Sequence, residues 1–349
     1  MKTFKIAVIP GDGIGKEVMD IALEILETYT ENKAYGFEYT EYPWGCDYYK
    51  QTGHMMPEDA LDILQAYDAI LLGAVGDPSV PDHISLHGLL LKIRQGFKQQ
   101  VNLRPVKSLK NAPSPIKDAS GIDILFVREN VEGEYAGLGE FIFEKGEIQK
   151  ATQTAIFSRD NTRAVMSYAF KLAEMRKGKI TSVTKSNALN YSMVFWDNIF
   201  NELCPSFDIK CKESIHVDAM SMYLIQNPQA FDVVVASNLF GDILTDLGAA
   251  LQGGLGFAAS ANLNIEGTHP SMFEPVHGSA PAIAGKGIAN PMAMVWSVKL
   301  MLDYLLPFEN HESLLYAIEK TLENKVHLTP DLGGQGSSQR VKEEIKKWL

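Results

Sequence analysis

The chain has 349 residues, of which 46% are hydrophobic, so it can bury a large core and its length suggests about two domains. Charged residues make up 21% of the sequence, which excludes an intrinsically disordered chain. The net charge of −11 argues against nucleic acid or an anionic membrane surface as a partner. An anionic substrate can still bind where arginines, lysines or a metal ion provide local positive charge.

Three cysteines without paired C-x-x-C spacing indicate reduced thiols rather than a disulfide framework or a zinc site (Cys46, Cys204 and Cys211). No apolar run reaches the roughly 18 residues that a bilayer crossing requires. The apolar stretch 4–10 leads directly into Gly-Asp-Gly, which is typical of a strand and not of a signal peptide. We therefore expect a cytoplasmic protein that does not bind membranes.

Short β-branched runs alternate with segments of helical periodicity, which predicts an α/β fold. In chain order we expect a strand at 4–10, a helix at 16–29, a strand at 68–76, a short helix at 89–97, a strand from 122, a hairpin at 141–158, a helix at 162–178, strands at 179–187 and 231–238, and a helix at 241–252.

Changes in composition near residues 99–102 and 253–256 predict two crossings between domains. The first domain would be a cofactor-binding domain formed by residues 1–99 and 255–349. The second, residues 100–254, would carry the substrate and metal residues, the dimer contacts and a hairpin arm at about 137–158.

Asp242 and Asp246 lie four residues apart on a predicted helix, so their side chains share one face. Their mutual repulsion would become attraction if a cation bound between them; otherwise they are two solvated acids. Asp218, which follows a strand-like segment, could supply a third oxygen ligand, and such a set suits Mg²⁺ or Mn²⁺. We leave the nearby His216 out, because a histidine at a strand end is more often structural.

Three arginines fall at the ends of apolar elements and could hold the two carboxylates of a diacid, although any one of them, taken alone, is more often a surface or salt-bridged residue (Arg94, Arg104 and Arg128). Lys185 ends a strand and could accept a proton, because nearby positive charge and burial would lower its pKa. Tyr135 follows an acidic loop and could return a proton.

The glycines of 11–15 do not have the G-x-G-x-x-G spacing of a dinucleotide-binding turn, so we interpret this segment as a tight strand-to-helix turn. The small residues of 277–281 are a better cofactor candidate, because they allow close backbone approach. His277 and Asn290 could stack on an adenine or hydrogen-bond to it.

These segments together resemble the isocitrate/isopropylmalate dehydrogenase superfamily, almost end to end. The resemblance is carried by IPGDGIGKEV, NLRPV, VRENVEGEY, TKSN, SNLFGDILTDLG, EPVHGSAP and GKGIANP. Within the superfamily, WGCDYY, VPDHISL and PSMFEPVHGSAP are similar to the tartrate dehydrogenase/D-malate dehydrogenase (decarboxylating) branch. The resemblance implies a two-domain α/β fold with a mixed central sheet flanked by helices, and a cofactor site that is not of the Rossmann type.

The resemblance also implies residue roles and an assembly. The expected catalytic residues are Tyr135, Lys185 and Asp218, and the expected metal ligands are Asp218, Asp242 and Asp246. The expected substrate-binding residues are Arg94, Arg104, Arg128, Leu90 and His87. The expected NAD-binding residues are Ile14, Gly73, Ala74, Asn187, His277, Gly278, Ser279, Ala280, Pro281 and Asn290. Lys185 and Asp218 would reach the site from a partner subunit, so we expect a homodimer or a higher oligomer. A monovalent cation such as K⁺ is a further possible cofactor.

Two positions depart from the family pattern. NAD-binding members usually carry an aspartate after HGSAP, and NADP-binding members carry Lys-Tyr, whereas this chain has Ala282 and Ile283. NADP preference is therefore not supported, and the lost charge-assisted bond to the ribose would cost about 1.5–3 kcal/mol of NAD affinity. The second departure is His87, where this branch often has tryptophan, and it leaves the identity of the substrate open.

The sequence thus predicts a metal-dependent, NAD-linked enzyme that oxidises and decarboxylates a small 2-hydroxy diacid, D-malate to pyruvate and CO₂ or tartrate. The main alternative is 3-isopropylmalate dehydrogenase, because Leu90 and Leu91 could receive an apolar substituent. Isocitrate is a weaker alternative. A metal-dependent phosphohydrolase and an inactive metabolite-binding relative remain as remote alternatives.

Overall fold

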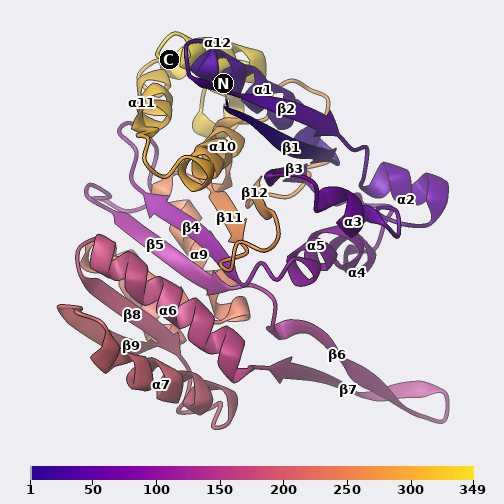
Figure 1. Ribbon diagram of the computed structural model, residues 1–349, viewed down its shortest axis with the longest axis vertical. Coiled ribbons are helices and arrows are strands. Elements are labelled where there is room, and N and C mark those ends of the chain that lie inside the picture. The colour runs from indigo at the N-terminus through magenta and orange to yellow at the C-terminus, as the bar shows by residue number, and fades with distance from the viewer. Residues whose placement is uncertain (1) are drawn as a thin grey trace. The chain divides into compact units, whose positions relative to one another are not determined.

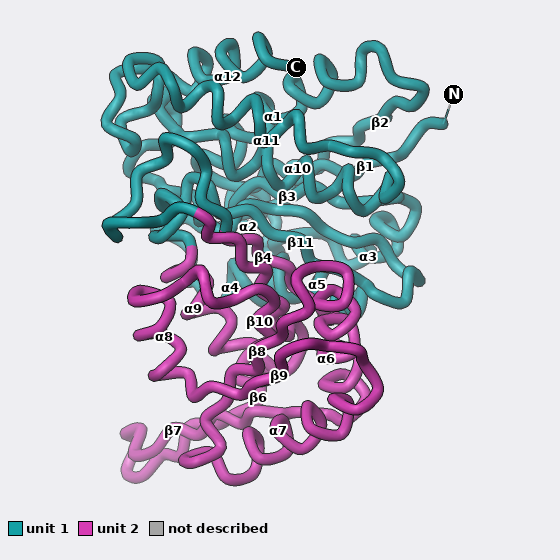
Figure 2. The backbone as a smooth tube through the Cα atoms, turned by 90° about the vertical axis from the view of Figure 1, so that its left-hand side faces the viewer, with its two compact units in different colours: residues 1–99, 107–120, 249–349 teal, residues 100–106, 121–248 magenta. Residues whose placement is uncertain are grey.

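The computed structural model describes residues 2–349 and divides into two compact units (Figure 2). The first unit comprises residues 1–99, 107–120 and 249–349, and the second comprises residues 100–106 and 121–248. None of the helices in residues 2–349 has the length and apolar content that a bilayer crossing requires.

The first unit contains five strands in the order β2-β1-β3-β12-β11 (Figure 1). β1 runs parallel to β2 and β3, β3 is parallel to β12, and β12 is antiparallel to β11, so this sheet is mixed. The strands are β1 (Lys2–Gly11), β2 (Tyr35–Glu41), β3 (Ala69–Ala74), β11 (Ala259–Leu263) and β12 (Ser271–Pro275).

Helices and buried apolar residues of the 44–97 segment pack against the strands of this sheet. α1 packs against β3 and α10, and α10 packs against β11 and β12. Ala7, Ile9, Ile70 and Leu72 join a core cluster with residues of the 44–97 segment. The helices of this unit are α1 (Ile14–Thr30), α2 (Cys46–Thr52), α3 (Ala60–Leu64), α4 (Asp82–Ser85), α5 (Leu91–Gly96), α10 (Met292–Leu305), α11 (Glu312–Thr321) and α12 (Ser338–Lys346).

The main sheet of the second unit has the strand order β4-β5-β10-β8-β9, and β5, β10, β8 and β9 are mutually parallel. Parallel neighbours place their carboxyl ends at one edge of the sheet, where side chains from several strands can meet. The elements are β4 (Val101–Lys107), β5 (Asp123–Glu129), β8 (Lys179–Thr184), β9 (Cys211–His216), β10 (Val233–Ala236), α6 (Arg159–Met175), α7 (Ser192–Leu203), α8 (Val217–Gln226) and α9 (Asn238–Gln252).

A separate two-stranded hairpin is formed by β6 (Gly133–Glu144) and β7 (Glu147–Ile156), as Figure 1 shows. It turns at Lys145 and Gly146, whose φ angles of 53° and 84° are those of a two-residue hairpin turn. Phe141, Phe143 and Ile148 are exposed on it. A hairpin was predicted at 141–158, and the structure has one whose turn lies in that range, although its first strand begins earlier, at Gly133.

The unit boundaries differ from the predicted division at 107–120 and 249–254, which fall in the first unit and not the second. Hydrogen bonds explain the position of 107–120, because the Lys107 N–H donates to Gln252 Oε1 and the Lys110 N–H to Glu319 Oε1. The short helix expected at 89–97 also differs. A π-helical turn, Leu86–Leu90, precedes α5.

The turn after β1 is held by the buried carboxylate of Asp12. Asp12 Oδ1 accepts a hydrogen bond from the Cys46 N–H at 2.8 Å, and Oδ2 accepts one from the Gly76 N–H at 2.9 Å. Gly11 and Gly13 have φ angles of 70° and 55°, which favour glycine. One carboxylate therefore fixes three loops at the carboxyl edge of the first sheet.

Replacing Asp12 with alanine would leave two backbone N–H groups without their acceptor. We expect Asp12→Ala to lower the free energy of unfolding by about 2 kcal/mol or more, measured by urea denaturation. Asp12→Asn keeps one carbonyl acceptor and should lose less. An equal free energy of unfolding for wild type and Asp12→Ala would show that the two hydrogen bonds accepted by Asp12 do not stabilise the fold.

Candidate functional site

The Asp242 carboxylate receives three donors in the second unit. Arg128 Nη1 lies 2.6 Å and Arg104 Nη2 lies 3.2 Å from Oδ1, and the Tyr135 hydroxyl donates to Oδ2 at 3.0 Å. Both arginines are buried, whereas the Asp242 side chain is 37% exposed. The four residues therefore form one polar cluster that solvent reaches at Asp242.

Each member of this cluster is placed by its own element. Arg128 precedes the last residue of β5, Arg104 lies on neighbouring β4, and Tyr135 lies near the start of β6. Arg104 is held further by Thr245, one turn after Asp242 on α9, whose Oγ1 accepts from Nη1 at 2.7 Å. The helix thus fixes both the carboxylate and an arginine that binds it.

The Tyr135 hydroxyl is kept protonated by its surroundings. Its pKa is raised from the ordinary value, first by burial and then by the negative charge of Asp242, although Arg128 and Arg104 oppose the shift. A neutral phenol can donate a proton, which agrees with the role expected for this residue.

Lys185 and Asp218 form a second polar pair in the same unit, with Nζ 2.7 Å from Oδ1. Lys185 follows β8 and Asp218 lies in the first turn of α8, directly after β9. The pair meets because β8 and β9 are parallel neighbours whose ends are in register at Thr184 and His216. The hydrogen bond from Lys185 lowers the pKa of the Asp218 carboxyl.

Asp242 and Asp246 have the chemistry of a hard-cation site. Burial and the charge of Asp242 raise the pKa of Asp246, and Arg104 and Arg128 oppose this. Bringing a divalent cation beside these carboxylates would relieve the repulsion between them. Within one chain, residues 2–349 contain no group of three or more His, Cys, Asp or Glu side chains that could hold a metal. Asp218 therefore does not complete a three-aspartate set in a single subunit.

Arg94 lies in the first unit, where its Nη2 is 2.7 Å from Glu274 Oε1. Both side chains are buried, and Glu274 Oε1 also accepts from Asn262 Nδ2 at 2.8 Å. The predicted substrate arginine thus has a carboxylate partner already, which the sequence analysis did not identify. His87 and Leu90, the other expected substrate residues of this unit, lie on the π-helical turn before α5.

A cavity of about 210 Å³ in the first unit contains three of the expected cofactor residues, Ile14, His277 and Asn290. Asn290 Nδ2 donates to Asp331 Oδ2 at 3.0 Å, so both polar groups are fixed at the cavity wall. The lining is otherwise mostly apolar: Gly256, Ile283, Ile288 and Pro330. A Cβ at Gly256 would lie 2.6 Å from Asn290 Nδ2, so only glycine keeps this space open.

These features fit an adenine ring, which needs flat apolar walls and a few polar groups at its edge. His277 Nε2 is buried without a hydrogen-bond partner, and burial lowers the pKa of this imidazole, so it is neutral near pH 7. Asp331 is a further candidate that the sequence analysis missed, and its Pro-Asp-Leu-Gly-Gly turn was the only local signal.

The expected loop 277–281 lies beside the turn after β1. The Ile14 N–H donates to the Ser279 carbonyl at 2.9 Å, and a Cβ at Gly13 would lie 2.1 Å from that oxygen. A second hollow of about 380 Å³ is lined by Ser279, Pro281 and the 76–82 segment. Gly73 and Ala74 end β3 in the same unit, whereas Asn187 follows β8 in the second unit.

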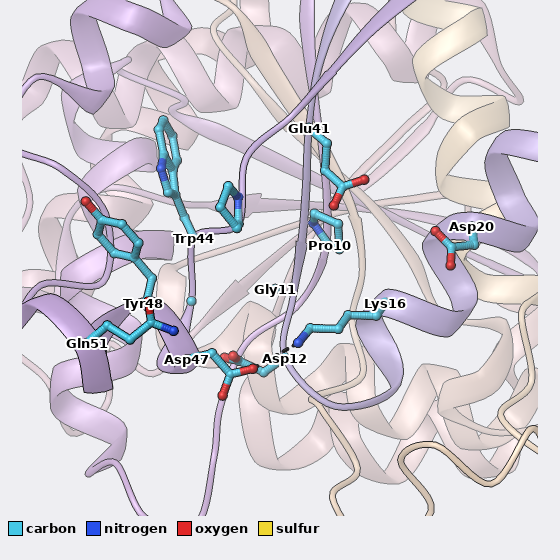
Figure 3. Close-up of a pocket in the computed structure, with 12 residues that line it drawn as sticks. Pro10, Gly11, Asp12, Lys16, Asp20, Glu41, Trp44, Asp47, Tyr48 and Gln51 are labelled. Carbon is cyan, nitrogen blue, oxygen red and sulfur yellow. Dashed lines mark hydrogen bonds and ion pairs between the residues drawn. The ribbon is translucent and has the colours of Figure 1, made fainter.

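A cavity of about 410 Å³ elsewhere in the first unit contains none of the expected site residues. Figure 3 shows Glu41 and Asp20 on one side of it and Trp44 and Tyr48 on the other. Lys16, which also lines this cavity, is paired with Asp47. Volume alone therefore does not identify the reactive site, because the groups suited to proton transfer and carboxylate binding lie in other places.

The family model described as "Isocitrate/isopropylmalate dehydrogenase" matches residues 5–346. The chain belongs to the isocitrate/isopropylmalate dehydrogenase family. The predicted superfamily is therefore confirmed. Members of this family use NAD or NADP and a divalent metal ion.

Two curated relatives of this family member align over almost their full length. It is 46% identical over 347 residues to the "Probable tartrate dehydrogenase/decarboxylase" of Bacillus subtilis (strain 168), covering 99% of this chain and 98% of the relative. It is 45% identical to the "D-malate dehydrogenase [decarboxylating]" of Escherichia coli (strain K12), with 99% of both chains covered.

A solved isocitrate dehydrogenase from Methylococcus capsulatus has the same fold, with a TM-score of 0.88, 32% identity and 99% of both chains covered. The predicted α/β fold of the isocitrate/isopropylmalate dehydrogenase type is thus confirmed.

Glu129, the last residue of β5, fixes the loop between Arg128 and Tyr135. Its buried Oε1 accepts hydrogen bonds from the N–H groups of Val131 and Glu132 and from Asn161 Nδ2, at 2.8–2.9 Å. Oε2 is buried and has no partner. Burial raises the pKa of this carboxyl, although the three donors oppose the shift.

This raised pKa makes stability fall as the pH increases. The folded state retains the Glu129 proton to a higher pH than the unfolded state, so its contribution is present below the unfolded pKa and is lost as the pH rises through the folded pKa. Glu129→Gln does not titrate. We expect the wild type to lose stability relative to this variant as the pH rises above the ordinary pKa of a glutamate, measured by urea unfolding at a series of pH values. Parallel pH profiles would contradict the assignment.

Proposed function

We propose that this protein is a metal-dependent, NAD-linked dehydrogenase that oxidises and decarboxylates a small 2-hydroxy diacid, D-malate or tartrate. The observation that carries the proposal is the Asp242 cluster, in which two buried arginines and a protonated tyrosine meet one carboxylate. Carboxylate recognition, metal binding and proton donation are three of the functions that this chemistry requires. The names of the relatives support the same substrate class.

The roles of the residues follow from their chemistry. Arg104 and Arg128 would bind the substrate carboxylates, with Arg94 as a third candidate. Lys185, in its neutral amine form, would accept the proton of the substrate hydroxyl. Asp218, whose Oδ1 lies 2.7 Å from Nζ, would stabilise the ammonium group that results. Tyr135 would donate a proton to the carbon from which CO₂ has left. His87 and Leu90 would contact the distal part of the substrate.

Asp242, Asp246 and Asp218 of a second subunit would hold Mg²⁺ or Mn²⁺. When bound, the metal supplies Lewis-acid polarisation of the substrate oxygens. Ile14, Gly73, Ala74, Asn187, residues 277–281 and Asn290 would bind the nicotinamide cofactor, which supplies the hydride acceptor. The absence of a three-acid group within residues 2–349 of one chain supports an assembly of at least two subunits. We also propose a cytoplasmic location, in keeping with the three free cysteines.

A substrate panel tests this function. Purified protein should form NADH with D-malate or tartrate and Mn²⁺, and should lose that activity when a chelator removes the metal. 3-Isopropylmalate and isocitrate are the comparison substrates, and NADP is the comparison cofactor.

Lys185→Met should abolish turnover because it removes the proton acceptor, while Mn²⁺ binding measured by calorimetry persists. Preference for 3-isopropylmalate would replace the proposed substrate. Wild-type rates in Lys185→Met would remove the role of this lysine, and phosphate release without NADH formation would contradict the dehydrogenase assignment.

Ala282 gives a test of cofactor choice. It is exposed and directly precedes Ile283 of the 210 Å³ cavity, so an aspartate can be introduced there without burying a charge. We expect Ala282→Asp to tighten NADH binding by about tenfold, because a carboxylate accepts charge-assisted hydrogen bonds from ribose hydroxyls. NADPH should not gain, because its phosphate would be repelled.

Fluorescence titration of both cofactors measures this effect, and Ala282→Asn, which lacks the charge, is the matched control. An unchanged NADH affinity in Ala282→Asp would place the ribose elsewhere.

A further inference from the structure

Asn238, the first residue of α9, is buried between Arg128 and the loop that precedes β6. Its Oδ1 accepts hydrogen bonds from Arg128 Nη2 at 2.7 Å and from Nε at 3.2 Å. Its main-chain carbonyl accepts from Nε at 2.9 Å. One residue therefore holds two of the three guanidinium nitrogens of Arg128.

The same turn of α9 is shaped around the stem of this arginine. A Cβ at Gly241 would lie 2.6 Å from Cγ and 2.8 Å from Cβ of Arg128, so the arginine passes where a side chain is absent. The next residue, Asp242, takes the third nitrogen, Nη1, at 2.6 Å. Asn238, Gly241 and Asp242 together fix both the path and the plane of the guanidinium.

Asn238 also holds the segment that leads to Tyr135. Its Nδ2 donates to the Glu132 carbonyl at 2.9 Å. The following Gly133 has a φ of 71°, and a Cβ there would lie 3.2 Å from Cβ of Asn238. Tyr135 lies two residues further along, with its hydroxyl 3.0 Å from Asp242. Asn238 thereby connects the arginine to the backbone that carries the tyrosine.

We propose that Asn238 is a positioning residue for the oxidative decarboxylation, acting through Arg128 and Tyr135 without touching the substrate. A planar guanidinium binds a carboxylate well only when its plane is fixed, and fixing it in advance avoids an entropic cost when the substrate binds. A shift of the Tyr135 segment would also misplace the proton donor. This inference rests on the proposed function.

The first test is the variant Asn238→Ala, which removes the side-chain bonds to Arg128 and Glu132. We expect the KM for D-malate or tartrate to rise about tenfold or more, with a lower kcat, while the KM for NAD changes less than about twofold. Asn238→Ser, which is small and tolerated at helix starts but too short to span both partners, should behave similarly if the alanine variant does not fold.

A double-mutant cycle separates positioning from general damage. Arg128→Lys retains the charge but cannot occupy the Asn238 oxygens with two nitrogens. If Asn238 acts through Arg128, adding Asn238→Ala to Arg128→Lys should raise the substrate KM by less than about twofold. An equal rise in both backgrounds would overturn the proposal, as would an unchanged substrate KM in Asn238→Ala alone.

Asp232→Ala is the matched stability control. Asp232 is buried just before β10, at the end opposite Asn238, and holds another arginine, with its Oδ1 2.7 Å from Arg176 Nε. This variant should lower the thermal midpoint without changing either KM. A tenfold rise of the substrate KM in Asp232→Ala as well would show that loss of stability alone explains the effect.

Calorimetric titration of D-malate and of tartrate into the same variants, with Mn²⁺ and without NAD, distinguishes failure of the proposed function from failure of the positioning role. A wild type that binds either diacid but oxidises neither would contradict the proposed function alone, and the affinity of Asn238→Ala would then still test the positioning role. A wild type that oxidises one of them, with Asn238→Ala at wild-type KM, would contradict the positioning role alone. No binding of either diacid by the wild type would contradict both.

Discussion

The arrangement of the second unit depends on one constraint, the need to keep two buried guanidinium groups charged and hydrogen-bonded. Arg104 and Arg128 are both buried, and a buried charge is stable only with a charged partner. Asp242 provides this partner at 2.6 and 3.2 Å and remains partly open to solvent. The pairing places the two arginines that we propose to bind substrate carboxylates beside the carboxylate that we propose to bind the metal, so stability and the proposed chemistry would depend on the same groups.

Several residues of this candidate site could be predicted from the sequence because they lie at or just after the ends of strands. Arg128 and Lys185 lie at or just after the carboxyl ends of parallel strands, and the structure places each beside another predicted site residue, Asp242 and Asp218 respectively, although these pairings themselves were not predicted. The helical spacing of Asp242 and Asp246 was also correct. Local periodicity and element ends carry this information, because parallel strands bring their carboxyl ends to one edge of the sheet.

The remaining contacts depend on pairings between distant parts of the chain, which no local pattern encodes. Arg94 meets Glu274 because β12 enters the same sheet as β1 and β3, and β11 and β12 were not identified from the sequence. Asp331 reaches Asn290 from a loop 41 residues further along. The π-helical turn before α5 was missed as well, since an inserted residue changes helical register without changing composition.

We propose that Asp242 and Asp246 of one subunit act together with Lys185 and Asp218 of another. Complementation between two inactive variants measures this most directly. Lys185→Met and Asp242→Asn chains with different affinity tags are co-expressed, and the mixed dimer is purified through both tags. If the site is formed between subunits, each mixed dimer has one intact and one doubly defective site and should recover about half of the wild-type activity. A mixed dimer as inactive as either parent would contradict the account.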